Sequence, residues 1–279
     1  MSQPLSEKDF SKLASVIQAQ LGIQMPASKR TMLSARIQKR LRILNIPTIH
    51  DYVEWVIDPQ KAGQEYVNFL DIVTTNKTDF FREPVHFDYL TQQIFPAAVE
   101  RGSGVRRPFK LWSAGCSSGE EPYTLAIVAK EFERSLGRPF QLQILATDIS
   151  SRVLKKAKNG VYEMERISPI SQELRKRYLL RHKDPQKSLC RMGPELRQMI
   201  RFDRLNFMDE SFNIREPMDV IFCRNVMIYF DRETQQRLVQ QFCRHLQPGG
   251  YIFIGHSESL NGLNVPVEQV APTIYQLGR

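Results

Sequence analysis

The sequence predicts an α/β protein in which a parallel or mixed sheet is covered by helices on both faces and is preceded by a small all-helical domain. Two observations support this prediction. Apolar residues recur at helical spacing up to residue 74, and after Phe109 short apolar runs alternate with amphipathic segments. The 279 residues also exceed the usual size of one hydrophobic core, which favours a main domain and a smaller one.

Successive amphipathic helices are expected in the N-terminal region. Pro26, Pro47 and Pro59 each stand where a helix should begin or end. The expected helices are Ser6–Gln20, Ser28–Leu44, Ile49–Ile57 and Gly63–Val73. We therefore expect a helical domain over residues 1–74.

The remaining chain, residues 75–279, is expected to form the sheet domain. Buried strands are predicted at Lys110–Ser113, Gln141–Thr147, Met218–Cys223 and Gly250–Ile254, and helices at Glu120–Leu136, Ser151–Lys158 and Arg232–Leu246. The alternation breaks down between Gly160 and Arg201, where a strand pair around Leu179 and at Ser188–Met192 is possible. This pattern predicts a small β-subdomain inserted at about residues 160–200.

Composition excludes several classes of protein. With 42% hydrophobic and 25% charged residues the chain is neither collagen-like nor largely disordered. No run approaches the roughly 20 apolar residues that span a bilayer, and the first ten residues lack a signal-peptide pattern, so a cytoplasmic location is expected. The four cysteines are widely spaced and the histidines do not lie near them at ligand spacing, so we expect reduced thiols and no metal.

The net charge of +9 is concentrated in two stretches. Residues 26–45 hold six basic residues and no acidic one, and residues 155–201 hold thirteen basic and five acidic residues. In the first stretch Arg36, Lys39 and Arg40 fall on one helical stripe. A solvated face explains such a run, and so does a docking face for an acidic partner. No aromatic residue interleaves this helix, which disfavours nucleic acid.

The segment from Leu111 to Tyr123 is a strand, a run of small residues and the start of a helix. Small residues there let the backbone approach a ligand at the carboxyl end of the strand. The GxGxxG fingerprint is absent, and Glu120 and Glu121 stand where a pyrophosphate would need a helix start free of negative charge. A nucleoside without phosphate, or a cationic one, fits this loop better.

The next predicted strand ends in Asp148. A carboxylate at this position can accept both hydrogen bonds of a ribose diol. Asp148 could instead cap the following helix, because Ser150 and Ser151 come directly after it. Together with the small-residue loop, the first interpretation is favoured.

These two motifs resemble the class I, Rossmann-like methyltransferases that use S-adenosylmethionine. Further motifs make the chain similar to the chemotaxis receptor methyltransferases, the CheR family. They are the segments 74–83 (TTNKTDFFRE), 119–123 (GEEPY), 222–231 (FCRNVMIYFD) and 255–259 (GHSES). The resemblance covers almost the whole chain, including the N-terminal helices.

The resemblance implies that the chain methylates glutamate γ-carboxylates on the cytoplasmic domain of chemoreceptors and releases S-adenosylhomocysteine, which sets adaptation in chemotaxis signalling. It also implies the residues of the cofactor site. Asn76, Thr78 and Arg82 line that site, and Glu121 and Asp148 hold the cofactor. The pocket is completed by Asn206, Phe207, Arg224 and Asn225.

The reaction needs little from the protein beyond positioning. A glutamate with a reference pKa of about 4.3 is ionised at neutral pH and needs no general base, so the task is to desolvate and align it. Arg82 is the candidate for steering the carboxylate or the cofactor, and Tyr229 for positioning the acceptor. Alternatively, Arg82 pairs only with Asp79 or Glu83, and Tyr229 is a core residue.

The expected partner is the acidic methylation region of a chemoreceptor. Arg36, Lys39, Arg40 and Arg42 are the candidate docking residues. Family members that bind a receptor's C-terminal peptide through the β-subdomain tend to have a glycine-rich loop there. The corresponding stretch, residues 181–188, has no glycine, which makes such tethering doubtful. No membrane insertion is expected.

Two other functions stay open at this point. A nucleic-acid methyltransferase would share the fold and the basic charge, but the fourth predicted strand ends in Cys-Arg-Asn-Val and lacks the Asn/Asp-Pro-Pro-Tyr pattern that grips an exocyclic amine. We therefore expect no nucleic-acid partner. A sensor that binds the cofactor without turnover is the third possibility.

Overall fold

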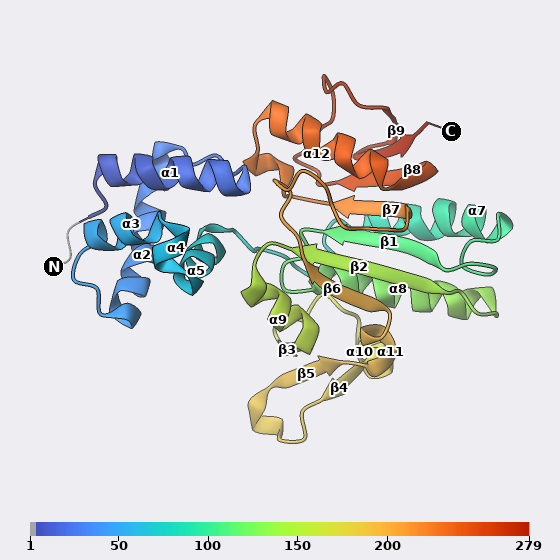
Figure 1. Ribbon diagram of the computed structural model, residues 1–279. Coiled ribbons are helices and arrows are strands. Elements are labelled where there is room, and N and C mark those ends of the chain that lie inside the picture. The colour runs from blue at the N-terminus through green and yellow to red at the C-terminus, as the bar shows by residue number, and fades with distance from the viewer. Residues whose placement is uncertain (1–3, 279) are drawn as a thin grey trace. The chain divides into compact units, whose positions relative to one another are not determined.

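The computed structural model describes residues 4–278, which form two compact units (Figure 1). The first unit contains the chain up to Thr75 and two later segments, Asn206–Met208 and Tyr229–Gln235. The second unit contains Asn76–Leu205, Asp209–Ile228 and the chain from Gln236 onward. Among the described residues, no helix has the length and apolar character required to cross a membrane.

The first unit is helical, as its apolar spacing predicts. Its elements are α1 (Glu7–Leu21), η1 (Ala27–Lys29), α2 (Arg30–Leu44), α3 (Ile49–Val56), α4 (Pro59–Ala62) and α5 (Gln64–Val73). The side chains of Ser6 and Thr48 cap α1 and α3 by accepting the N–H of Asp9 and Asp51. Pro59 is the first residue of α4, a short helix that the sequence analysis missed.

Two arginines of the predicted docking stripe are used inside this unit. Arg36 donates from Nη1 to the carbonyls of Ile72, at 2.7 Å, and Thr74, at 3.1 Å. Arg40 binds the carboxylate of Glu65 through both Nε, at 2.8 Å, and Nη2. These two half-buried arginines therefore also join α2 to the end of α5 and to Glu65. Lys39 and Arg42 remain exposed.

The second unit contains a sheet of seven strands within the described chain. Their order is β6 (Ile200–Arg204), β2 (Leu142–Asp148), β1 (Phe109–Ala114), β7 (Met218–Cys223), β8 (Leu246–Ile254), β10 (Ile274–Leu277) and β9 (Val267–Ala271). The first five strands run parallel, and β10 is antiparallel to both of its neighbours. Because the chain passes from β1 outward to β2 and later returns to β7, the strand order reverses between β1 and β7. Ligands bind at the carboxyl ends of strands beside such a reversal.

Helices cover both faces of this sheet, as the sequence predicts. Phe109 of β1 contacts Phe95 of α7 (Phe95–Glu100), with ring centroids 5.3 Å apart. Three residues later Trp112 points to the opposite face and packs at 5.1 Å on Phe242 of α12 (Arg232–Arg244). Phe95 also lies 5.1 Å from Phe132 of α8 (Glu120–Leu136), so α7 and α8 share the first face.

The remaining helices and the inserted sheet complete this unit. The helices are α6 (Val85–Tyr89), η2 (Leu90–Ile94), α9 (Ser151–Asn159), α10 (Gln172–Tyr178), η3 (Pro185–Lys187), α11 (Pro194–Arg197) and η4 (Met227–Tyr229). The last residue of η4, Tyr229, is grouped with the first unit. The insertion is an antiparallel sheet in the order β3 (Val161–Glu163), β5 (Leu189–Met192) and β4 (Leu179–Arg181).

The predicted α/β fold with an all-helical N-terminal region and a small inserted sheet is confirmed. The bounds of α8 and β7 agree with the predicted ones, and the predicted pair of inserted strands is β4 and β5. The sequence did not predict β3, which has only three residues, nor β6, β9 and β10. The last three lack a clear pattern. Their residues alternate with charged or polar ones, and most side chains of β9 and of β6 are exposed, so no continuous apolar run marks them.

Candidate functional site

A tight loop follows β1 at the carboxyl edge of the sheet. Gly115 has φ of +83°, and a Cβ at this residue would lie 2.6 Å from the side chain of Val226. The N–H groups of Gly115 and Cys116 both donate to the carbonyl of Thr147, which holds the loop against the end of β2. Only glycine fits at residue 115, so the small-residue signal in the sequence reflects a real steric limit.

Asp148 lies at the end of β2, beside this loop. Its carboxylate accepts the N–H of Ser117 and the N–H of Ser150, each at 2.9 Å, and the side chain is buried. The cap of α9 is Ser150, whose side chain accepts the N–H of Val153. The alternative that Asp148 is the helix cap is therefore wrong, and its carboxylate is fixed at the strand end.

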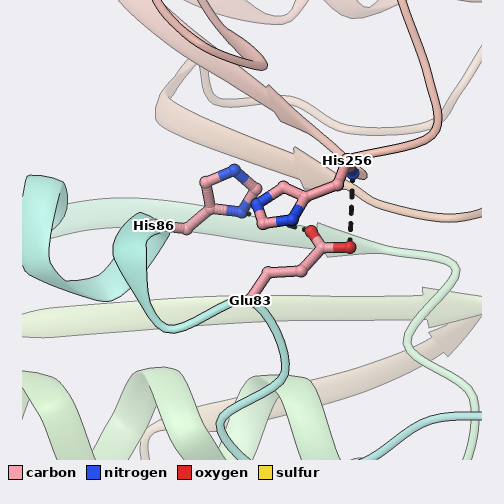
Figure 2. A group of neighbouring side chains, drawn as sticks. All are labelled: Glu83, His86 and His256. Atoms are coloured by element: carbon pink, nitrogen blue, oxygen red, sulfur yellow. Dashed lines mark hydrogen bonds and ion pairs between the residues drawn. The ribbon is translucent and has the colours of Figure 1, made fainter.

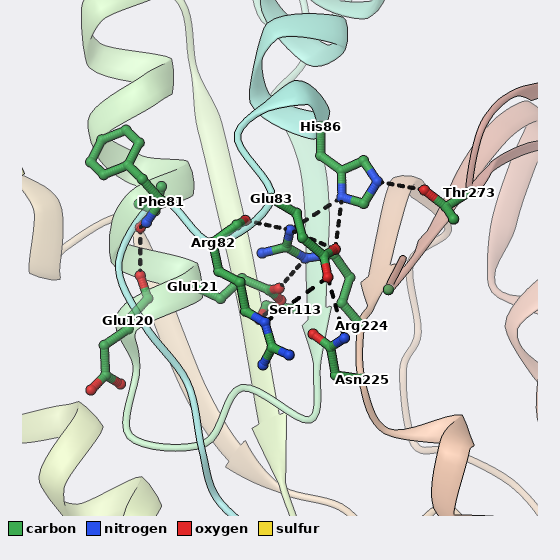
Figure 3. Close-up of polar contacts among 12 residues, drawn as sticks. Phe81, Arg82, Glu83, His86, Ser113, Glu120, Glu121, Arg224, Asn225 and Thr273 are labelled. Atoms are coloured by element: carbon green, nitrogen blue, oxygen red, sulfur yellow. Dashed lines mark hydrogen bonds and ion pairs between the residues drawn. The ribbon is translucent and has the colours of Figure 1, made fainter. Parts of the chain in front are cut away.

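A buried arginine forms the centre of the polar network beside β1 and β7 (Figure 3). Arg224 follows β7 and donates from Nε to Glu121 at 2.7 Å, while the other oxygen of Glu121 accepts the hydroxyl of Ser113 at 2.7 Å. Arg224 also donates from Nη1 to the carbonyl of Arg82 at 2.7 Å. Its guanidinium lies over the rings of Phe87 and Phe222, 5.2 and 5.4 Å from their centroids.

Glu83 joins three chain segments at this network. Its carboxylate lies 3.5 Å from Nη1 of Arg224 and accepts Nδ2 of Asn225 at 3.3 Å and the N–H of His256 at 3.2 Å. Burial would raise the pKa of Glu83, but the hydrogen bond from His256, the charge of Arg224 and the amide of Asn225 outweigh it and lower that pKa. Glu83 therefore stays ionised at neutral pH and holds the loop after residue 76 to the loop after β7.

Glu258 organises the turn that presents Asn225. Its carboxylate accepts the N–H groups of Asn225 at 2.8 Å, Gly255 at 2.6 Å and Ile228 at 3.2 Å. Burial raises the pKa of Glu258 despite these hydrogen bonds. The GHSES motif thus supplies a carboxylate that shapes the backbone, and His256 next to it is exposed.

The loop that carries Asn76, Thr78 and Arg82 is fixed from another direction by Arg166. That guanidinium donates to the carbonyl of Thr78 at 2.6 Å, to Asp79 at 3.2 Å and to the fully buried Glu120 at 2.9 Å. Asp79 therefore pairs with Arg166. Of the two acids in the GEEPY motif, Glu120 serves this ion pair and Glu121 faces Arg224.

Arg82 itself is loosely held. Its Nη1 donates to the carbonyl of Lys77 at 3.3 Å, and its Nε lies 4.0 Å from Glu83. The side chain is 34% exposed, and an exposed ion pair at this distance contributes little to stability. Of the two pairings considered from the sequence, only the one with Glu83 occurs, and it is weak.

Backbone strain gathers at this edge of the sheet. Phe81, Glu83, Ser117 and Asn225 are not glycine, yet their φ angles lie between +49° and +60°. This conformation is unfavourable for side chains with a Cβ and persists where the surrounding structure enforces it. The four residues belong to the three loops that meet around Arg224 and Asp148.

Two residues that the resemblance implies, Asn206 and Phe207, and the acceptor candidate Tyr229 lie in the first unit. Asn206 donates to the carbonyl of Gln20 at 2.8 Å, and Phe207 follows it in the same segment. The carbonyl of Tyr229 accepts the N–H of Gln24, and its ring lies 5.0 Å from the ammonium group of Lys29. The second unit by itself brings together Asn76, Thr78, Arg82, Glu121, Asp148, Arg224 and Asn225.

Glu83, His86 and His256 offer ligand atoms that lie within 4.8 Å of one another (Figure 2). The spacing of histidines relative to cysteines in the sequence does not indicate this group. Nη1 of Arg224 lies 3.1 Å from Nδ1 of His86 and 3.5 Å from Glu83, so a fixed positive charge already occupies the position that a cation would need. Asp9, His50 and Glu54 form a second such group, where Lys12 already pairs with Glu54.

Sequence reasoning assigned no role in the site to Ser113, Glu83, His86, Arg166 or Glu258. Ser113 and Glu83 lie inside motifs that were recognised, so their position in the motif was an available signal. His86 and Arg166 carry no such signal, because their partners are distant in the sequence.

The arrangement supplies buried carboxylates and a guanidinium at the ends of β1, β2 and β7. Carboxylates fixed by backbone N–H groups can accept the hydroxyl groups of a sugar or face a cationic ligand. The hydroxyl of Ser113 donates to Glu121 and that of Ser117 donates to the carbonyl of Asn76, so neither of these serines is paired with a histidine base. The geometry therefore suits binding and alignment of a cationic nucleoside.

Comparison with protein families finds two matches that together span most of the chain. The family described as "CheR methyltransferase, all-alpha domain" matches residues 8–74. The family described as "CheR methyltransferase, SAM binding domain" matches residues 76–275.

Curated relatives are similar over nearly their full length. A chemotaxis protein methyltransferase of Borreliella burgdorferi is 34% identical over 98% of this chain and 95% of its own. One of Salmonella typhimurium is 33% identical over 99% and 92%, and one of Klebsiella aerogenes is 37% identical over 98% and 91%.

Proposed function

Because this chain belongs to the CheR methyltransferase family, we propose that it methylates glutamate γ-carboxylates on the cytoplasmic domain of chemoreceptors. The chain is a methyltransferase that uses S-adenosylmethionine. Methyl esters on receptor glutamates set adaptation in chemotaxis signalling, and a cytoplasmic substrate implies a cytoplasmic reaction. The match over nearly the whole chain carries this proposal.

The residues at the strand ends fit S-adenosylmethionine. Gly115 leaves room for backbone to approach a ligand, and the carboxylates of Glu121 and Asp148 suit a ligand with a positive charge and a ribose diol. We assign Asp148 to the ribose and Glu121, with Asn76, Thr78, Arg82, Arg224 and Asn225, to the rest of the cofactor. Asn206 and Phe207 belong to the same proposed site. The bound cofactor supplies an electrophilic methyl group on a sulfonium.

The protein's own contribution is to bring an ionised glutamate into line and exclude water from it. A glutamate with a reference pKa of about 4.3 is already deprotonated at neutral pH, which explains why the site needs no general base. Arg82 has a partly exposed guanidinium next to the network, with only a weak ion pair to Glu83, and is the candidate for steering the incoming carboxylate. Tyr229 is the candidate for positioning the acceptor through its hydroxyl.

The receptor docks, in this proposal, on the exposed basic residues of α2. Arg30, Lys39 and Arg42 are exposed, whereas Arg36 and Arg40 are held inside the helical unit. An acidic receptor helix would be attracted to this face over a distance set by ionic strength. The loop of residues 181–188 has no glycine, and we do not extend the proposal to tethering through a receptor's C-terminal peptide.

We further propose that the chain works as two functional parts. Residues 1–74 would dock the receptor, and residues 75–279 would bind the cofactor, with the subdomain at about 160–200 inserted in the second part. The family matches at residues 8–74 and 76–275 support this division.

The proposed reaction is tested by transfer of tritiated methyl from S-adenosylmethionine to a chemoreceptor cytoplasmic fragment, with tRNA and DNA in parallel. We expect label on the receptor that mild base releases as methanol, because carboxyl esters are base-labile. A matched receptor fragment with its methylation glutamates changed to alanine should stay unlabelled. Label on nucleic acid alone, or base-stable label on the receptor, would contradict the proposal.

A further inference from the structure

His86 is a fully buried histidine whose protonation state can be deduced from its partners. It lies on α6, outside every sequence motif used above to assign a site residue. Its Nε2 lies 2.8 Å from Oγ1 of Thr273, in the turn between β9 and β10 (Figure 3). Oγ1 of Thr273 donates its only hydrogen to the carbonyl of Pro272 at 2.6 Å. Oγ1 must therefore accept from His86, so the hydrogen of the imidazole is on Nε2.

The other nitrogen of His86 faces the arginine of the site. Nδ1 lies 3.1 Å from Nη1 of Arg224. A guanidinium can only donate, so Nδ1 accepts this hydrogen bond through its lone pair. The same Nη1 donates to the carbonyl of Arg82, and Nε of Arg224 donates to Glu121. His86 thus fixes the side of the guanidinium that faces away from Glu121.

The charges around His86 favour the neutral ring. Burial, the positive charge of Arg224 and that of His256 lower the pKa of His86 to about 4, and Glu83 opposes them only in part. The ring also packs edge-on against Phe253, with centroids 5.4 Å apart. Nδ1 also lies 3.6 Å from an oxygen of Glu83, but it is closer to Nη1 of Arg224, at 3.1 Å. A neutral imidazole with its hydrogen on Nε2 therefore satisfies the two shorter contacts, to Thr273 and Arg224.

We propose that His86 is a positioning residue for methyl transfer: it accepts a hydrogen bond from Arg224 and thereby orients the guanidinium that holds Glu121. This inference rests on the proposed cofactor site, and it adds a residue that acts through Arg224 without touching the cofactor. It also gives the turn between β9 and β10 a role, because Thr273 sets the tautomer in which Nδ1 can accept the hydrogen bond from Arg224.

Two substitutions separate this role from simple packing. His86→Asn keeps an acceptor on Cγ, where Nδ1 is attached, but loses the ring, whereas His86→Phe keeps the ring and loses the acceptor. We expect His86→Phe to weaken S-adenosylhomocysteine binding by roughly tenfold, the scale of one hydrogen bond to a charged group, and to raise KM for S-adenosylmethionine more than it lowers kcat. His86→Asn should bind within about threefold of wild type. If packing were the only role, the order would be reversed, and that result would overturn the inference.

A measurement on the unaltered protein covers the case in which the variants fold poorly. In the protein carrying ¹⁵N-labelled histidine, nitrogen chemical shifts and couplings distinguish the two neutral tautomers and the charged ring. With the ring of His86 assigned in the unaltered protein by correlation to its own backbone resonances, we expect it at pH 7 to be neutral with hydrogen on Nε2. If the wild-type spectrum shows no such ring, or shows it charged or with hydrogen on Nδ1, the inference is wrong.

The variant Glu121→Gln distinguishes an error in the proposed cofactor site from an error in the role proposed for His86. Weaker product binding in Glu121→Gln together with an unchanged affinity in His86→Phe would overturn the role of His86 and leave the proposed function standing. Unchanged affinity in Glu121→Gln would overturn both the site assignment and the inference.

Discussion

Each unit of this protein contains an ion pair between an arginine and a buried glutamate, and the two pairs differ in what surrounds them. In the helical unit, Glu65 accepts from Arg40, from the hydroxyl of Tyr52 at 2.9 Å and from Asn68 at 2.9 Å. Every one of these partners lies on a helix of the same unit. This pair joins α2, α3 and α5, and its position predicts a role in folding.

The pair of Arg224 and Glu121 lies instead among loops at the carboxyl ends of strands. Its neighbours include Glu83 and Asn225 in strained conformations and the neutral His86. Backbone strain of this kind gathers at functional sites. Two pairs with the same chemistry therefore serve different purposes, and it is their position in the fold that tells them apart.

The largest predicted effect concerns the helical pair. Arg40→Met should lower the free energy of unfolding by about 3 kcal/mol, because it leaves the buried Glu65 carboxylate without its charged partner. Lys39→Met, on the exposed side of the same helix, should change it by less than about 0.5 kcal/mol. Urea unfolding measures both. A raised receptor KM with unchanged stability in Arg40→Met would return Arg40 to the docking face.

The next largest effect is expected on turnover at the proposed cofactor site, at the carboxyl ends of β1, β2 and β7. Arg82→Ala should lower kcat by about 100-fold and weaken S-adenosylhomocysteine binding less than tenfold, because its guanidinium is expected to align the receptor carboxylate. Lys77→Ala removes a positive charge from the same loop and should leave kcat nearly unchanged. Steady-state kinetics and calorimetry give the two quantities. Equal losses in turnover and in affinity would assign Arg82 to cofactor binding alone.

Asp148→Asn should weaken cofactor binding by roughly tenfold, since the amide loses one of the acceptor oxygens of the carboxylate. Asp203→Asn, on the exposed neighbouring strand β6, is the matched control and should bind normally. Isothermal titration with S-adenosylhomocysteine measures both affinities. An unaltered affinity in Asp148→Asn would refute the ribose assignment.

The two regions should also differ in how pH affects their stability. His86 has a lowered pKa of about 4 in the folded protein, against about 6.5 unfolded, so the unfolded chain binds more protons between these values. Stability should therefore fall as pH drops from 6.5 to 4, by at most about 1.4 kcal/mol per pH unit for this group. Burial alone would raise the pKa of Glu65, but the hydrogen bonds from Arg40, Asn68 and Tyr52 lower it, so its contribution is lost only as pH falls below its usual pKa.

Urea unfolding at pH 4.5 and 6.5 separates these contributions. The loss of stability between these two pH values should be smaller in His86→Phe than in wild type, because the variant lacks the group that titrates in this range. If His86→Phe loses as much stability as wild type between pH 6.5 and 4.5, His86 is not the source of that loss.

The smallest effect is expected on the receptor-facing side of α2. Changing Lys39 and Arg42 together to Glu should raise the receptor KM about threefold to tenfold at low salt and less at high salt, because exposed charges act through screened, long-range attraction. Arg101 and Arg106, in the loop before β1, provide a control with the same change of charge. A KM that stays the same at every salt concentration would show that α2 does not dock the receptor.

The sequence predicted those parts of this molecule that depend on local pattern. The bounds of α8 and β7 follow from apolar spacing, and the ends of β1 and β2 located Gly115 and Asp148. The family resemblance then implied Glu121, and the structure gives Glu121 and Glu120 different partners, Arg224 and Arg166.

Contacts between distant residues could not be predicted in the same way. Arg40 appeared to be a surface residue because its partner Glu65 lies 25 positions away on another helix. His86 and Thr273 are 187 positions apart, and nothing near either one indicates the other. The spacing of apolar residues along the sequence indicates which face of a helix or strand a residue occupies. It does not indicate which distant residues pack against that face.

The most direct test of the central claim is a crystal structure of the protein with S-adenosylhomocysteine. We predict the product at the carboxyl ends of β1 and β2, with its ribose hydroxyls bonded to Asp148 and with Glu121 held by Arg224 next to it. The ion pair of Arg40 and Glu65 should be unchanged. Product bound elsewhere on the protein, with neither Asp148 nor Glu121 in contact, would contradict the account.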